Sequence, residues 1–171
     1  MKILLLLLTT FLFSFEKAYC KKLVVLDVSK KDYKLESSLG TFPVVVGKEI
    51  GDKVQEGDRK TPEGVYFVTG EIPRSSMTNE HGAFAFNLSF PNAWDLIHNI
   101  GGSGIWIHGS ITENRVDLMR DTRGCVALKN SDISKIAPNL RKEIVFVRIW
   151  KDSIPNPCLL YTSDAADEED S

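Results

Sequence analysis

Two residues of this chain have the side-chain chemistry of a nucleophile and its base. His108 ends a short apolar stretch, and Cys125 follows Gly124 seventeen positions later. A cysteine attacks as its thiolate, which a neighbouring imidazole can supply by taking the proton, and a backbone carbonyl or carboxylate often orients that imidazole. Gly124 allows a tight turn, and N–H groups around Gly124 and Cys125 could bind an oxyanion. A lone cysteine is more often a small buried residue than a nucleophile, so this pair alone favours a buried cysteine, with a catalytic thiol as the alternative.

The first twenty residues have the order of a secretory signal. Lys2 precedes an apolar run from Ile3 to Phe15, and Ala18-Tyr19-Cys20 offers a cleavage site after Cys20. The run is shorter than the roughly 20 apolar residues of a membrane span. We therefore expect residues 1–20 to be a signal peptide and the protein to be exported to the periplasm or cell envelope. A retained membrane anchor is the alternative.

The other end of the chain differs in composition from the rest. The stretch 158–168 resembles the in-frame translation of a sequencing-library adapter, so we expect residues 158–171 to be non-native, or else a disordered acidic tail. Residues 21–157 then form the body, in which Cys125 is the one cysteine. In an exported protein, a cysteine without an internal disulfide partner favours a reactive thiol. A thiol oxidoreductase would need a C-x-x-C pair, and the sequence has none.

The body has the size and composition of one globular domain. It carries 19 Lys and Arg against 17 Asp and Glu, so no basic face for nucleic acid is indicated. Short β-branched stretches predict strands, and a long Gly- and Pro-containing loop covers 47–64. Two short helices are expected, the second capped by Asn130 or Ser131 and ended near Pro138. The strands are expected at 22–28, 32–37, 41–46, 65–69, 83–88, 104–108 and 142–150, and the helices at 91–99 and 132–136.

Three motifs in this order resemble the YkuD-type L,D-transpeptidases of bacterial cell walls. That family has His-Gly, a spacer, and then Ser or Thr, one residue, Gly and Cys; this chain has His108-Gly109 and Thr122-Arg123-Gly124-Cys125. The segments 57–66 (GDRKTPEGVY), 90–92 (FPN) and 105–109 (IWIHG) are also similar to family segments. The resemblance covers residues 23–150 and implies a mainly β, sandwich-like fold with a few short helices.

The resemblance also implies a role for each matched residue. Cys125 would be the acylated nucleophile, His108 its base, and the carbonyl of Gly109 would orient the imidazole. Gly124 and Cys125 would line the oxyanion site, with Thr122 beside them. The residue before Gly-Cys is often histidine in the family, whereas Arg123 stands here, which makes the chain similar to the YafK-like branch.

The implied reaction is acyl transfer on peptidoglycan stem peptides. The cysteine would cleave the bond between the third residue, a diamino acid, and the fourth, D-Ala, through a thioester. An amine acceptor would give L,D-transpeptidation, and water would give L,D-carboxypeptidase trimming to a tripeptide. A catalytically inert wall-binding module is the alternative from another class. This chemistry requires neither a metal nor an organic cofactor.

The remaining polar residues carry weaker signals. Arg120 and Arg123 flank the nucleophile and could hold a substrate carboxylate, with ordinary solvated arginines as the alternative. Trp106 is expected in the core or in the wall of the pocket. Arg59 and Lys60 are assigned to the loop surface. His81 and His98 match no compact zinc spacing with His108 and Cys125, so we expect no metal site.

Overall fold

The computed structural model describes residues 21–110 and 112–155. The expected signal peptide (1–20) and the expected tail (158–171) lie outside the described residues. The strands are β1 (Leu23–Ser29), β2 (Lys34–Ser37), β3 (Gly40–Pro43), β4 (Val46–Gly47), β5 (Gly64–Glu71), β6 (Ala85–Leu88), β7 (Trp106–His108), β8 (Arg120–Thr122), β9 (Val126–Ala127) and β10 (Ile144–Trp150). The helices are α2 (Ala93–Ile97), α3 (Asn130–Lys142) and the 3₁₀ turns η1 (Arg74–Ser76), η2 (Asn79–His81) and η3 (Glu113–Leu118).

Eight of these strands form one sheet, in the order β3-β2-β1-β10-β5-β6-β7-β9. β1 and β10 pair in parallel at its centre, although they come from opposite ends of the described chain. Val45 and Ala127 exchange two backbone hydrogen bonds of 2.8 Å, which join the β9 end of the sheet to the segment that follows β3. The sheet therefore curls back on itself around an apolar core, and the prediction of a mainly β fold is confirmed.

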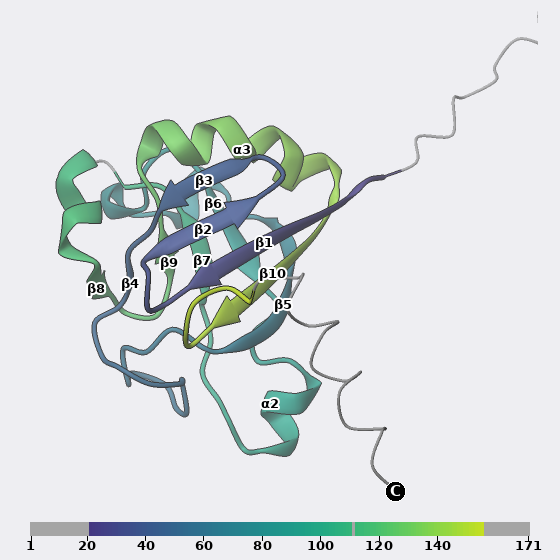
Figure 1. Ribbon diagram of the computed structural model, residues 1–171, viewed down its shortest axis with the longest axis vertical. Helices are drawn as coiled ribbons and strands as arrows, with labels where there is room; N and C mark the ends of the chain where they lie inside the picture. Colours follow the sequence, from purple (N-terminus) through teal and green to yellow (C-terminus); the bar gives the residue numbers. More distant parts are fainter. Residues whose placement is uncertain (1–20, 111, 156–171) are drawn as a thin grey trace, which may run out of the picture.

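Side chains along the strands alternate between buried and exposed positions, as in a sheet with one face on the core. Along β10 every second residue is buried, and in β5 Tyr66 is fully buried while its neighbour Phe67 is 46% exposed. The buried side chains from the strands meet those of α3 in one cluster. In Figure 1, α3 runs along the top of the sheet and α2 projects at the opposite end. No helix in residues 21–110 or 112–155 is long and apolar enough to cross a bilayer.

The second predicted helix is the main correction to the expected elements. The sequence predicted a helix over 132–136 that ends near Pro138, but α3 continues through Pro138 to Lys142. A proline inside a helix removes one hydrogen bond and disfavours the helix. Here the apolar side chains on one face of α3 are buried against the core, and this packing outweighs the local penalty. They are Ile133, Ile136, Ala137 and Leu140.

Candidate active site

His108 and Cys125 are brought together by two short parallel strands. β7 pairs with β9 so that Ile107 lies opposite Val126 and His108 opposite Ala127. Because side chains alternate along a strand, His108 and Trp106 share one face of β7. Cys125 immediately precedes β9, in the register that puts it opposite Trp106 and on that same face. Both side chains line a single cleft.

The His108 imidazole is held in one tautomer. Its Nδ1 lies 2.5 Å from the carbonyl oxygen of Gly109. A carbonyl oxygen only accepts, so Nδ1 carries the proton and Nε2 keeps its lone pair. The residue is 3% exposed, and this burial lowers the pKa of His108 to about 4. At neutral pH, His108 is therefore an uncharged base.

Gly109 is required at this position by its neighbours. A Cβ on Gly109 would lie 2.5 Å from Oδ1 of Asn130 and 2.8 Å from Cγ2 of Ile133, at the start of α3. The same Asn130 oxygen accepts the N–H of Ala83 at 2.7 Å, just before β6. The expected helix cap at Asn130 or Ser131 is wrong, since Lys129 is the N-cap. Instead, the Asn130 side chain bonds the segment before β6 and lies close against Gly109.

Cys125 is a half-buried free thiol. Its Sγ donates to the carbonyl of Gly104 at 3.4 Å. Burial raises the pKa of the Cys125 thiol, and the Trp106 backbone and the charge of Arg123 only partly oppose this. With the pKa of the cysteine raised and that of His108 lowered, the resting pair is thiol and imidazole rather than thiolate and imidazolium.

The turn before Cys125 is shaped by Thr122 and Gly124. The Thr122 hydroxyl donates to the Cys125 carbonyl at 2.7 Å and accepts the Gly124 N–H at 3.1 Å. Gly124 has a φ of +133°, and a Cβ there would lie 2.8 Å from the Lys60 carbonyl oxygen. The turn therefore needs glycine. Because the Gly124 N–H donates to the Thr122 hydroxyl within the turn, it is not available as an oxyanion donor.

The cleft has a volume of about 860 Å³ and is strongly polar. Trp106 and Arg123 line it, one of the two alternatives that the sequence left open for each. Arg120 does not, because its Nε donates to the Tyr33 hydroxyl at 2.7 Å outside the cleft. Arg59, assigned to the loop surface from the sequence, does line it. The other lining residues are Glu56, Gly57, Glu80, His81, Ser103, Gly104, His108, Arg115, Asp121, Thr122 and Cys125.

Sequence reasoning weighed His81 only as a metal ligand and missed its place in the cleft. Its ring centroid lies 5.0 Å from that of His108, edge to face, and 4.9 Å from that of Trp106. The Thr78 N–H donates to its Nδ1 at 3.1 Å, which leaves the proton of the neutral ring on Nε2. Its position on η2 depends on this local cap and on a distant strand, so the sequence near His81 holds no signal for it.

The described residues contain no group of three or more side chains suited to holding a metal ion. His98 stacks on Trp94 at the end of α2, with its Nδ1 2.8 Å from the Trp94 carbonyl oxygen. It does not line the cleft.

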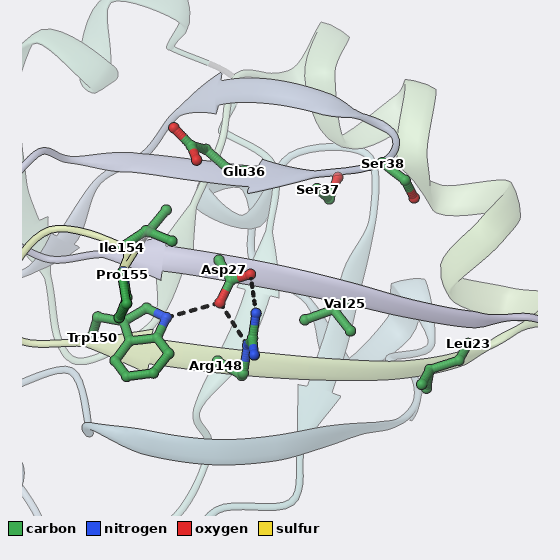
Figure 2. Close-up of a pocket in the computed structure, with 10 residues that line it drawn as sticks. All are labelled: Leu23, Val25, Asp27, Glu36, Ser37, Ser38, Arg148, Trp150, Ile154 and Pro155. Carbon is green, nitrogen blue, oxygen red and sulfur yellow. Dashed lines mark hydrogen bonds and ion pairs between the residues drawn. The ribbon is translucent and has the colours of Figure 1, made fainter. Parts of the chain in front are cut away.

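A second hollow, of about 750 Å³, lies on another part of the surface, over β1 and β10 (Figure 2). Arg148 grips the Asp27 carboxylate with two hydrogen bonds of 2.7 and 2.6 Å, and the indole N–H of Trp150 adds a third of 2.8 Å. Glu36 at the rim is paired with Lys34. The lining of this hollow includes no cysteine and no histidine, so we place the candidate site in the other.

Comparison with known proteins places most of the body in one family. Residues 21–149 match the YkuD family model, described as the L,D-transpeptidase catalytic domain. The chain is 31% identical over 98 residues to YafK of Escherichia coli K12, which carries an L,D-transpeptidase name, covering 57% of this chain and 35% of YafK. The chain therefore spans about a third of that curated relative.

Two solved structures share the fold. The helical cell-shape-determining protein Pgp2 of Campylobacter jejuni superposes with a TM-score of 0.66 at 29% identity, over 77% of this chain and 48% of that one. An L,D-transpeptidase from Xylanimonas cellulosilytica gives 0.50 at 16% identity, over 77% and 62%, which supports the fold alone.

Proposed function

Because the chain belongs to the YkuD family of L,D-transpeptidase catalytic domains, we propose that it is a cysteine acyltransferase acting on peptidoglycan stem peptides. One observation carries the proposal. His108 and Cys125 lie on one face of adjacent parallel strands, in one cleft, with the imidazole held by the Gly109 carbonyl so that its basic nitrogen is free. An inert binding module needs no such arrangement.

The first step is attack on the carbonyl between the diamino acid at position three and D-Ala at position four. The thiol leaves its hydrogen bond to Gly104, and its proton moves to His108 Nε2 as the sulfur bonds to the carbonyl carbon. The Cys125 N–H is the donor we assign to the resulting oxyanion, since the Gly124 N–H is donated to Thr122. The C–N bond then breaks, the leaving amine takes the proton from Nε2, and a thioester remains.

The second step releases the acyl group. An acceptor loses a proton to His108 Nε2 as it attacks the thioester carbon, and the sulfur leaves and recovers that proton. An amine acceptor gives a new peptide bond, and water gives a tripeptide. Both outcomes use the same residues, so transpeptidation and L,D-carboxypeptidase trimming are both compatible with the site.

We assign the other lining residues to positioning and substrate binding. The Thr122 hydroxyl holds the turn that presents the nucleophile. Trp106 forms the wall beside His108 and Cys125, and Arg123 offers a guanidinium to a substrate carboxylate. Export to the periplasm, and a catalytic domain over residues 21–157, are part of the same proposal, because the substrate lies in the cell envelope.

Purified protein incubated with tetrapeptide muropeptides tests the proposal. We expect release of D-Ala with the wild type and none with Cys125→Ala, read by mass spectrometry. Tripeptide alone identifies trimming, and a 3–3 cross-linked dimer or D-amino-acid exchange identifies transpeptidation. Trapping an acyl adduct on Cys125 provides direct support. Absence of product and adduct in a folded wild-type protein contradicts the enzyme proposal.

A further inference from the structure

Five of the seven arginines in this chain have a partner, and the two without one among the described residues both line the cleft. Arg115, Arg141 and Arg148 pair with carboxylates, Arg120 donates to the Tyr33 hydroxyl, and Arg74 donates to the Gly82 carbonyl. Within the described residues, the Arg59 and Arg123 side chains make no hydrogen bond or ion pair, and both line the cleft. This separation is not expected of arginines scattered over a surface.

The backbones that carry these two arginines are tied to the same short segment. The Lys48 N–H donates to the Thr122 carbonyl at 2.9 Å, next to Arg123, and the Glu49 N–H donates to the Arg59 carbonyl at 3.1 Å. The carbonyl of Lys60 is packed against Gly124, which immediately precedes the nucleophile. Arg59 and Arg123 therefore approach the Cys125 turn from two sides of one segment.

The loop around Arg59 is rigid although its side chain is free. The Asp58 carboxylate accepts the N–H groups of Val54, Gln55 and Lys60 and pairs with the buried Lys53. Arg59 itself has a φ of +56°, a left-handed conformation that a long side chain rarely adopts. A fixed, strained backbone that carries an unpartnered guanidinium is the arrangement of a preorganised binding group.

The acidic side chains of the cleft do not neutralise these arginines. Asp121 is paired with Arg115, and Glu56 accepts the N–H and hydroxyl of Ser103. Glu80 lines the same cleft and is bonded to neither Arg59 nor Arg123. Two guanidinium groups therefore remain available to a ligand anion, and a carboxylate matches their planar fork.

Resting on the proposed function, we propose that Arg59 acts with Arg123 as a clamp for the free C-terminal carboxylate of the residue that leaves. That carboxylate lies one residue beyond the scissile carbonyl, roughly 4 Å along the chain. It is thus the substrate anion nearest to the turn that both arginines flank. The clamp restricts the enzyme to the terminal bond of a stem peptide and makes Arg59 a specificity-determining residue.

The experiment compares a stem tetrapeptide as free acid and as C-terminal amide. We expect the wild type to prefer the acid in kcat/KM by about tenfold to a hundredfold, as expected of a lost charge-assisted contact. Arg59→Gln removes most of this preference, chiefly through KM, and leaves the amide rate within twofold. Since both arginines hold one carboxylate, the loss in Arg59→Gln/Arg123→Gln is smaller than the product of the single losses. Arg120→Gln, outside the cleft, is the matched control.

Binding to the Cys125→Ala protein separates this proposal from the proposed function. Titration with the same two peptides reports the clamp without turnover, and Arg59→Gln in that background should abolish the preference for the acid. Turnover with equal kcat/KM for acid and amide, or equal loss for both in Arg59→Gln, overturns the clamp alone. A preference in binding that depends on Arg59, in a protein that turns over neither peptide, supports the clamp and contradicts the enzyme proposal.

Discussion

Two hollows of similar volume lie on this protein, and they differ in how their charges are used. Over β1 and β10, the Asp27 carboxylate takes three hydrogen bonds from Arg148 and Trp150 (Figure 2). In the cleft beside β7 and β9, Arg59 and Arg123 have no partner in the described residues, and His108 keeps one ring nitrogen free. The volumes, about 750 and 860 Å³, do not distinguish the two.

A polar group that already has its hydrogen-bond partners stabilises the fold, whereas one without a partner can bind a ligand. Asp27 and Arg148 join neighbouring strands, so their hydrogen bonds hold the sheet and leave nothing for a ligand. Around the cleft, the side chains of Asp58, Thr122 and Asn130 hydrogen-bond to the backbone and hold it in place. Two of the guanidinium groups that line the cleft, by contrast, have no partner in the described residues. The two hollows should therefore respond in opposite ways to substitution: one in activity, the other in stability.

The largest effect is expected at His108, the proposed proton acceptor. His108→Gln preserves size and polarity but cannot accept a proton, so kcat should fall by about 10²- to 10⁴-fold while KM changes little. Tetrapeptide turnover by mass spectrometry measures this, with circular dichroism to verify folding. A variant that retains more than a tenth of wild-type kcat would remove His108 from the mechanism.

The next effect is expected at the turn that presents Cys125. In Gly124→Ala, the new Cβ meets the Lys60 carbonyl oxygen and Ile105 Cδ1 at 2.8 and 2.9 Å, in a backbone conformation that alanine disfavours. We expect a loss of ~1–3 kcal/mol in the free energy of unfolding and a fall in kcat/KM of roughly 100-fold. Urea unfolding and turnover measure the two.

Gly70→Ala is the matched control for this substitution. Gly70 has no positive φ, and a Cβ there would have nothing within 4 Å. It should leave both the unfolding free energy and kcat/KM near wild type. Equal behaviour of the two alanine variants would show that the Gly124 contacts do not constrain the turn.

A substitution in the hollow over β1 and β10 should lower stability and leave turnover nearly unchanged. Asp27→Ala leaves Arg148 and the Trp150 indole N–H without their shared partner, at a cost of ~1–2 kcal/mol, because Arg148 is half-exposed and water replaces part of the lost contact. Turnover should stay within twofold. Glu36→Ala, which breaks only the exposed pair with Lys34, should cost less than ~0.5 kcal/mol. A large loss of turnover in Asp27→Ala would mean that the two hollows are coupled.

Much of the fold follows from local patterns in the sequence. A regular strand over 65–69 points Tyr66 and Phe67 to opposite faces, and in the structure Tyr66 is the buried one and Phe67 the exposed one. The helix over 91–99 was also expected, and its observed core α2 begins after an Asn92 cap that bonds Asp95 reciprocally. Continuation of α3 past Pro138 was not predictable locally, because tertiary burial of one helix face decides it.

The residues of the site likewise fall into those that local motifs predict and those that only tertiary contacts reveal. Fixed motifs identified His108, Gly109, Gly124 and Cys125 as candidates. The structure brings His108 and Cys125 to one cleft, with each glycine next to one of them in the chain. Arg59 is exposed on its loop as expected, but the sequence did not indicate that this loop lines the cleft, because the packing of the Lys60 carbonyl on Gly124 is a tertiary contact. Arg120 and Arg123 are three positions apart and equivalent by sequence, yet Tyr33, distant in the chain, engages only Arg120.

The smallest effect concerns the pH dependence of the cleft. Burial holds the pKa of His108 at about 4, so His108 remains a neutral base down to that pH, and the acid limb of kcat/KM should lie near pH 4 rather than near 6.5. His81 lies against the His108 ring and adds a neighbouring charge when protonated. His81→Ala uncovers the ring, which should raise its pKa and move the acid limb upward, toward 6.5. His81→Phe keeps the ring covered and should leave the limb near that of the wild type, as should His98→Ala outside the cleft. If the alanine and phenylalanine variants shift the limb equally, then cover by His81 is not what keeps His108 neutral, and the burial must come from the strands alone.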